Sequence, residues 1–332
     1  MKNYNDSIGL IALSNLKGIG PAFIKKYSNQ IEFKKGNFSE SIFNVLDYAK
    51  KECNNEDVLN NIENAKELYE RSEKEDIKII SILSDDYPKT LKELKDAPPI
   101  LFCKGNLEII NNSSVCIIGT REPNNTGSKI ATRIGEYFSN KKYSICNGLA
   151  EGIDTFSIQK DGHFFNNTIG ILAGGLNFSS KNTLLKKTAY NAEKILENSG
   201  LLISEMPINK KEDTISVVKS CRIQAGISAS LILVQSSLTG GSKFTIKAFA
   251  ELVRPIAAVF PVNEDLLLES YKANISIINE GANGLSEMTN LKYDKIKTSD
   301  IILLKSKNDY QVLENKMSTN LHQRSDIPTA LF

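Results

Sequence analysis

The chain has 332 residues, enough for a sizeable hydrophobic core and, by length, for two domains. Its 41 lysines and arginines nearly balance 39 acidic residues, which excludes a bulk cationic field as the basis of nucleic-acid binding. Five scattered cysteines and only two histidines form no zinc motif and favour reduced thiols in a cytoplasmic protein. We recognise no signal peptide or membrane-spanning run and expect no metal or cofactor.

Residues 1–75 are predicted to form a small helical domain, because apolar residues such as Ile8 and Leu16 recur at helical spacing. Gly18 and Gly20 interrupt this pattern. They resemble the turn of a helix-hairpin-helix, whose amides hold a nucleic-acid phosphate. A helix–helix turn that only needs positive φ explains them equally well, so both interpretations stay open.

Residues 76–112 are predicted to be a connector laid along a larger domain. The apolar run 78–83 favours one strand there. Pro88, Pro98 and Pro99 follow, and proline breaks helices and fixes extended geometry.

Residues 113–290 are predicted to be an α/β domain of Rossmann-like type, a parallel sheet flanked by helices. Short β-branched runs end at glycine or serine turns, and a helical pattern follows each turn. Ligands of such sheets bind at the carboxyl ends of the strands. Residues 291–332 are expected to be a polar tail with one apolar run, 301–304. The predicted strands are 115–118, 143–146, 168–172, 201–204, 230–234 and 256–260.

Small and polar residues follow these strands, beginning with Gly119-Thr120-Arg121. One glycine-rich loop is weak evidence, but several at one sheet edge predict a groove whose donors bind an anion. Arg121 adds a charge and a planar donor fork, unless it pairs with a neighbouring carboxylate. The standard dinucleotide and P-loop motifs do not occur.

Three other residues admit two interpretations each, and a fourth admits one. Arg222 is either a phosphate ligand or a partner in an ion pair. Asp154 either caps a helix or orients Arg121. Glu205 is a candidate general base, but no partner stands beside it in sequence, so a structural role is favoured. Cys116 lies within a predicted central strand and is expected to be a packing residue.

The order of these motifs resembles the bacterial DNA-processing protein A family, DprA or Smf. The resemblance covers roughly residues 80–285, and the segment around Gly18 is similar to the family's N-terminal helical domain. The segments that carry it are Asp86-Tyr87-Pro88, 98–107, 117–121, 147–154, 174–177, 204–205, 222–228 and 237–250.

This resemblance implies a non-enzymatic homodimer that binds and protects single-stranded DNA without sequence preference. It also implies loading of a RecA-type recombinase in transformation or recombination. The positions matched to DNA or phosphate binding are Gly119, Thr120, Arg121, Gly148, Lys181, Arg222, Gly240, Gly241, Ser242 and Thr245.

The chain departs from the family pattern at several places, and two of these departures change the charge available to a phosphate. Glu151 stands where an arginine is typical and would repel a phosphate. The usual Arg-Asn-Arg is reduced to Ser220-Cys221-Arg222, and phosphate contacts dominate non-specific binding. One alternative is therefore a nucleotide sensor or nucleoside-monophosphate-cleaving enzyme that uses Gly240-Gly241, Thr245 and Glu205. Another is a protein-interaction scaffold with a vestigial groove.

Overall fold

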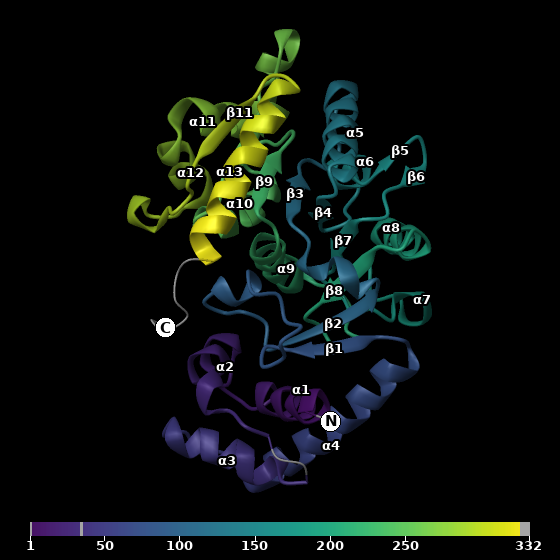
Figure 1. Ribbon diagram of the computed structural model, residues 1–332, viewed down its shortest axis with the longest axis vertical. Helices are drawn as coiled ribbons and strands as arrows, with labels where there is room; N and C mark the ends of the chain where they lie inside the picture. The colour runs from purple at the N-terminus through teal and green to yellow at the C-terminus, as the bar shows by residue number, and fades with distance from the viewer. Residues whose placement is uncertain (1, 34–35, 326–332) are drawn as a thin grey trace.

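The computed structural model describes residues 2–33 and 36–325 (Figure 1). In these residues the strands are β1 (Lys78–Ser81), β2 (Ile100–Gly105), β3 (Ser114–Ile118), β4 (Ser144–Asn147), β5 (Gln159–Lys160), β6 (His163–Phe164), β7 (Thr168–Ile171), β8 (Leu201–Ser204), β9 (Ser230–Leu233), β10 (Ile256–Val259) and β11 (Ile301–Leu304). The helices are α1 (Lys2–Ser14), α2 (Pro21–Tyr27), α3 (Phe38–Tyr48), α4 (Asn55–Lys74), α5 (Asn125–Asn140), α6 (Ile153–Ser157), α7 (Phe178–Lys181), α8 (Lys186–Glu197), α9 (Thr214–Ile227), α10 (Ser242–Ala250), α11 (Lys272–Glu280), α12 (Ala282–Thr289) and α13 (Asn308–Ser325).

One sheet organises the molecule, with strand order β1-β2-β8-β7-β4-β3-β9-β10-β11 in the described part of the chain. The strands from β8 to β11 in this order are parallel, as in the pairs Val115↔Ile145 and Cys116↔Leu231. All six strands predicted for the α/β domain are present, with no end shifted by more than one residue. Their side chains are fully buried because helices cover both faces, so the predicted Rossmann-like α/β fold is confirmed.

Helices lie on the two faces of this sheet according to the direction in which the chain winds. From β3 the chain steps through β4 and β7 to β8, with α5, α6 and α8 packed on one face. It then returns through α9 to β9 and steps the other way, with α10, α11 and α12 on the opposite face. Right-handed crossovers require this change of face when the winding direction reverses. No helix of the described residues combines the length and apolarity needed to cross a bilayer.

The N-terminal helices form a unit that packs on the β1 edge of the sheet (Figure 1). Helix α1 contacts α4, and both contact β1. Gly18 has φ of +78°, whereas Gly20 is extended and precedes α2, which begins at Pro21. The Lys51 ammonium donates to the Gly18 carbonyl oxygen at 3.0 Å. The turn thus needs positive φ at Gly18, and its proposed phosphate-binding role stays a prediction.

Residues 76–112 are more than the connector that was expected, although the one strand predicted in them, over 78–83, is present as β1. They supply β1 and β2, an antiparallel extension of the sheet with Ile79 opposite Phe102 and Cys103 opposite Ile203. The prolines at 98 and 99 immediately precede β2, where a missing N–H leaves the ladder intact.

The predicted polar tail is also corrected. Its apolar run forms β11, which pairs in parallel with β10. Helix α13 follows and buries Tyr310, Leu313 and Met317, one helical stripe in an otherwise polar sequence. The Tyr310 ring lies 4.9 Å from that of Tyr137 in α5, measured between ring centroids. A narrow apolar stripe is enough to pack α13 against the domain, because the buried residues all lie on one side of the helix. Residues 326–332 of the predicted tail lie outside the described residues.

Candidate nucleic-acid interface

Five loops meet at the carboxyl edge of the parallel strands. They follow β3, β4, β7, β8 and β9, which are neighbours in the order β8-β7-β4-β3-β9. Parallel strands end on the same side of a sheet, so the topology places the predicted glycine-containing loops along one edge. Strand β3 lies between β4 and β9, and the loop after it is central to this edge.

The turn that follows β3 is held by its protein neighbours. The Thr120 amide donates to the Gln235 carbonyl oxygen at 2.7 Å, so this amide is not available to an anion. A Cβ at Gly119 would lie 2.6 Å from Ile153 Cγ1, which explains why glycine is needed. Helix α5 begins only at Asn125. The preceding residue, Asn124, caps the helix by accepting a hydrogen bond from the Gly127 amide at 2.8 Å. The predicted cradle of amides at a helix start is therefore not what this turn forms.

Arg121 is exposed at the centre of the edge. Burial raises the pKa of Asp154 and of Glu212, and the charge of Arg121 opposes both shifts, so the guanidinium lies near these carboxyls. It forms no ion pair with any carboxylate that the structure describes. The alternative of a surface arginine committed to a neighbouring carboxylate is thus not what the structure shows.

Asp154 stabilises the loop after β4 through hydrogen bonds to its backbone. Its Oδ2 accepts hydrogen bonds from the amides of Gly148 at 3.1 Å and Ala150 at 3.3 Å. Burial raises its pKa to about 7, against the opposing effect of these two amides. Asp154 therefore neither caps a helix nor forms an ion pair with Arg121, and the Gly148 amide predicted for phosphate is already engaged.

Glu151 is exposed on the same loop, beside the Arg121 turn. The next residue, Gly152, has φ of +83° and lies where this loop meets the Arg121 turn. A Cβ at Gly152 would lie 2.4 Å from the carbonyl oxygens of both Thr120 and Arg121, so the two loops touch through their backbones. Glu151 thus lies on a loop that packs against the Arg121 turn.

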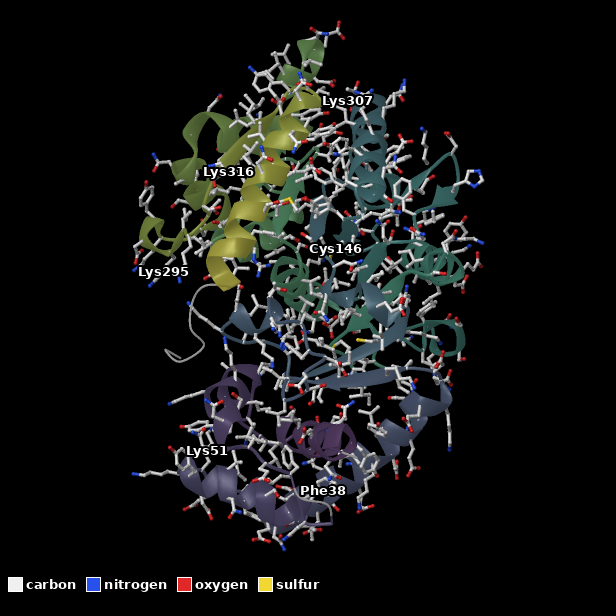
Figure 2. All side chains as sticks on the ribbon, viewed as in Figure 1. Phe38, Lys51, Cys146, Lys295, Lys307 and Lys316 are labelled. Atoms are coloured by element: carbon white, nitrogen blue, oxygen red, sulfur yellow. The ribbon has the colours of Figure 1, made fainter. Side chains whose placement is uncertain are left out.

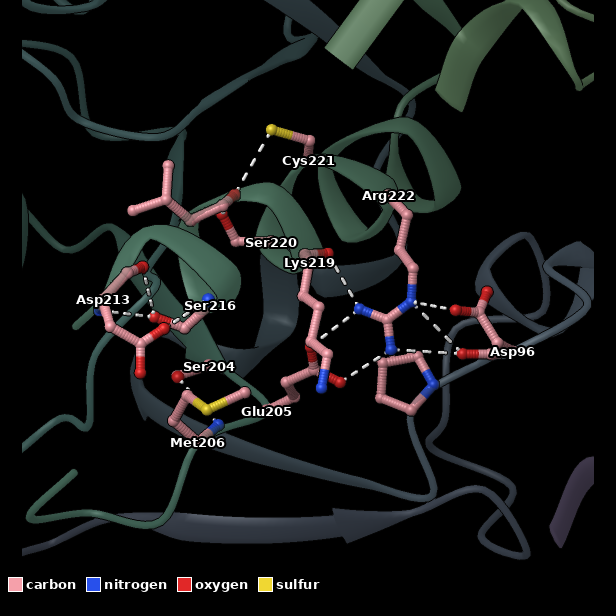
Figure 3. Close-up of polar contacts among 12 residues, drawn as sticks. Asp96, Ser204, Glu205, Met206, Asp213, Ser216, Lys219, Ser220, Cys221 and Arg222 are labelled. Atoms are coloured by element: carbon pink, nitrogen blue, oxygen red, sulfur yellow. Dashed lines mark hydrogen bonds and ion pairs between the residues drawn. The ribbon is translucent and has the colours of Figure 1, made fainter. Parts of the chain in front are cut away.

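Arg222 in α9 occupies a very different environment (Figure 3). Its two terminal nitrogens each contact one Glu205 oxygen at 2.7 Å, and its Nε lies 2.8 Å from Asp96 Oδ2. The side chain of Arg222 is only 13% exposed, and that of Glu205 only 10%. Arg222 is therefore a structural link between α9, the end of β8 and the segment before β2. Its assignment to phosphate binding is corrected, and Glu205 has the structural role favoured above.

The loop after β9 is partly closed as well. The Gly240 amide donates to the Ser237 carbonyl oxygen at 3.2 Å, whereas Gly241 is exposed with no atom near a hypothetical Cβ. Ser242 begins α10, and the Thr245 side chain is buried against Cys221. Lys181 is exposed at the end of α7, on the loop side of β7.

The proposed nucleotide-cleaving constellation is not assembled. Glu205 follows β8 and Gly240-Gly241 follows β9, with β7, β4 and β3 between them. Four strand spacings of about 4.8 Å separate the two loops. The described residues also hold no group of three potential metal ligands.

Comparison with known proteins decides the family. Residues 78–294 match the family described as DNA recombination-mediator protein A. The chain belongs to this family. It is 29% identical to the DNA processing protein DprA of Bacillus subtilis over 211 residues, which are 63% of this chain and 68% of the relative. It is 24% identical to the protein Smf of Synechocystis over 82% of this chain and 68% of that protein.

Two solved DprA structures share the fold. The Streptococcus pneumoniae protein superposes with a TM-score of 0.67 at 22% identity and covers 94% of this chain and 98% of its own. The Helicobacter pylori protein, whose structure was analysed for its mode of binding single-stranded DNA, gives a TM-score of 0.55 at 19% identity. That match covers 74% of this chain and 97% of the other.

In this member of the DNA recombination-mediator protein A family, the sequence analysis missed two residues at the carboxyl edge. Lys243 and Phe244 lie in the first turn of α10, directly after the loop that follows β9. Phe244 is an exposed aromatic side chain, and the Lys243 ammonium lies 5.4 Å from its ring centroid. Their position immediately after Gly240-Gly241-Ser242 was the available signal, because a residue there must lie at the strand-end edge.

Proposed function

We propose that this chain binds single-stranded DNA along the carboxyl edge of its parallel sheet, without catalysing a reaction on it. The observation that carries the proposal is Arg121, an exposed guanidinium at the centre of that edge with no ion pair among the described residues. Exposed Lys181 and half-buried Lys243 extend positive charge to either side. The mode of binding described for the Helicobacter pylori relative supports the same ligand class.

Phe244 adds a second kind of contact to this proposal. Proteins that bind single strands without sequence preference combine backbone cations with aromatic side chains on which bases stack. Phe244 is exposed, and Lys243 beside it places a cation next to the ring. A strand that passes from Arg121 to α10 would meet both kinds of group.

The same edge limits the affinity that we expect. Glu151 brings a carboxylate to the Arg121 turn, and Arg222 is committed to Glu205 and Asp96. Fewer cations are therefore available to a DNA strand than the family resemblance implied. We expect binding that is weak at physiological salt and rises steeply as salt is lowered.

The resemblance implies further roles that remain part of the proposal. They are a homodimer, protection of single-stranded DNA in the cytoplasm, and loading of a RecA-type recombinase in transformation or recombination. The description of the matched family as recombination mediators supports the last of these. Light scattering of the purified chain tests the dimer, and the rate of recombinase filament assembly on coated oligonucleotide tests the loading.

The DNA-binding proposal is tested by titrating labelled oligothymidylate at several salt concentrations. Replacing Arg121 with alanine is expected to weaken binding about tenfold, because hydrogen bonds to charged groups contribute about 1.5–3 kcal/mol. The slope of log affinity against log salt should become shallower by about 0.7. Lys141→Ala is the matched control, since Lys141 is exposed at the C-terminal end of α5, away from the strand-end loops. Affinity that ignores salt, or that survives Arg121→Ala, would refute the proposal.

A further inference from the structure

A cavity lies at the carboxyl ends of β10 and β11, and the DNA-binding proposal does not use it. Its volume is about 290 Å³, and α5 closes one side of it. Phe260 and Pro261 follow β10, whereas Tyr310 lies in the first turn of α13, beyond β11. The family match ends at residue 294, so the wall from Lys305 to Tyr310 comes from a segment outside that match.

Four cations line this cavity: Lys129 and Arg133 from α5, and Lys305 and Lys307 from the segment after β11. All four are exposed, and none pairs with a carboxylate within the described ranges 2–33 and 36–325. Asp265 is the one acidic residue in the described lining, and its Oδ1 accepts a hydrogen bond from Asn124 Nδ2 at 2.8 Å. The cavity therefore carries a clear excess of positive charge and suits an anionic ligand.

Tyr271 supplies a second and independent observation. Its side chain is fully buried and lines the same cavity. Its hydroxyl, Oη, has no hydrogen-bond partner among the described residues. A buried hydroxyl without a partner is costly, and a ligand that reaches Oη would remove that cost. Burial, and secondarily Asp265, raises the pKa of Tyr271 to about 12, so at neutral pH this hydroxyl is a hydrogen-bond donor.

The remaining walls are apolar and partly aromatic. Phe260 is half-buried, and the Lys305 ammonium lies 4.9 Å from its ring centroid. A flat ring and a cation side by side fit a ligand that has a planar heterocycle and a phosphate. The volume lies at the lower end of the range for small-molecule sites, about 300–1,000 Å³, and admits one nucleotide rather than a strand.

We propose that this cavity binds a nucleoside 5′-phosphate, with the phosphate on Lys305, Lys307 and Arg133 and the base against Phe260. The Tyr271 hydroxyl donates a hydrogen bond to the ligand. A free mononucleotide and the 5′-phosphorylated end of a DNA strand both offer this chemistry. The site lies further along the same carboxyl edge, at β10 and β11, and does not use Arg121.

The test measures calorimetric binding of thymidine and deoxyadenosine 5′-monophosphates to the full chain, with thymidine and inorganic phosphate as comparisons. We expect a monophosphate to bind more tightly than either comparison, because both halves of the cavity are used. Lys305→Gln with Lys307→Gln should weaken this binding at least about tenfold. The matched control is Lys292→Gln with Lys295→Gln, which removes the same charge. Figure 2 shows Lys307 and Lys295 at opposite ends of the C-terminal part of the molecule.

Tyr271→Phe separates a ligand contact from a structural one. If Oη serves a ligand, the variant should unfold at the same or a higher temperature than the parent and bind the monophosphate about threefold more weakly. A lower unfolding temperature with unchanged binding would overturn the role of Tyr271. Failure of both monophosphates to bind, or equal binding to the Lys305/Lys307 variant, would overturn the site.

Oligothymidylates with and without a 5′-phosphate assign the source of the ligand. If Lys305→Gln with Lys307→Gln weakens only the phosphorylated oligonucleotide, the site binds a strand end; if it weakens only the mononucleotide, the site binds a free nucleotide. Either result supports a nucleoside 5′-phosphate. Arg121→Ala should leave mononucleotide binding intact, so this proposal and the DNA-binding proposal fail in different measurements.

Discussion

Arg121 and Arg222 were matched to the same role, and the structure gives them opposite environments. Arg121 is exposed and has no ion pair with a described carboxylate, whereas Arg222 is 13% exposed and bridges Glu205 and Asp96. A guanidinium that is already bound to two carboxylates has no strong donor left for phosphate. The difference shows that a matched position identifies a residue type, and that its neighbours decide its function.

The largest effect expected from this contrast is on stability. Arg222→Ala should lower the free energy of unfolding by about 3–5 kcal/mol, because it leaves the Glu205 carboxylate buried and unpaired. Arg121→Ala should change it by less than about 0.5 kcal/mol, as for other exposed positions. Urea denaturation of both variants gives the comparison. Equal losses of stability would mean that the two arginines do not differ as described.

The next prediction concerns the pH dependence of stability, which depends on Asp154, the buried carboxyl near Arg121. The pKa of Asp154 is about 7 in the folded protein because the carboxyl is buried, above its ordinary value of 3.8. Folding therefore takes up a proton between these values, and this contribution to stability is full below about pH 4 and lost as pH rises through about 7. Asp154→Asn should remove that loss, an effect on the order of 4 kcal/mol at pH 8.

Denaturation of the parent and of Asp154→Asn across pH 4–8 measures this effect. The difference in unfolding free energy between variant and parent should grow with pH. A constant difference would show that Asp154 does not titrate in this range. Asp309→Asn is a control with the opposite sign. Burial would raise the pKa of the Asp309 carboxyl, but hydrogen bonds from the backbone amides of Ser306 and Lys305 lower it below its ordinary value.

Phe244→Ala tests whether the exposed edge binds bases as well as phosphates. Stacking of one base on an aromatic side chain contributes about 1–3 kcal/mol, so affinity for oligothymidylate should fall about tenfold. Unlike Arg121→Ala, this variant should leave the salt dependence unchanged, because no charge is removed. Phe244→Tyr should retain binding. A variant that binds as the parent does would exclude stacking at α10.

The smallest expected effect on oligonucleotide affinity comes from Glu151, on the loop that packs against the Arg121 turn. Glu151→Gln should strengthen oligonucleotide binding about threefold at low salt, with the gain fading as salt rises, because the repulsion between exposed charges is screened. Fluorescence anisotropy at two salt concentrations detects this change. Glu122→Gln is a matched control on the Arg121 turn, since Glu122 is exposed too. Equal gains from both would assign the effect to net charge rather than to Glu151.

The strands of the α/β domain were predictable because buried parallel strands read as short apolar runs with glycine or serine at their ends. Two segments contribute more secondary structure than was predicted, for a common reason. In 76–112 the prolines masked β2, and in 291–332 the polar residues masked the single buried stripe of α13. Both segments obtain their strands by pairing with residues distant in sequence, such as Ile203 and Ile256, and local patterns do not record such pairing.

The sequence by itself determined the fold class, the family and the presence of polar loops at one sheet edge, because hydrophobic periodicity and strand order depend on local pattern and right-handed winding. Only the tertiary structure decided which donors remain available. Asp154 engages the Gly148 amide, Gln235 engages that of Thr120, and Glu205 engages Arg222. Each partner is buried or half-buried near its donor, where unpaired polar groups are costly, so the fold satisfies them internally and leaves Arg121 exposed.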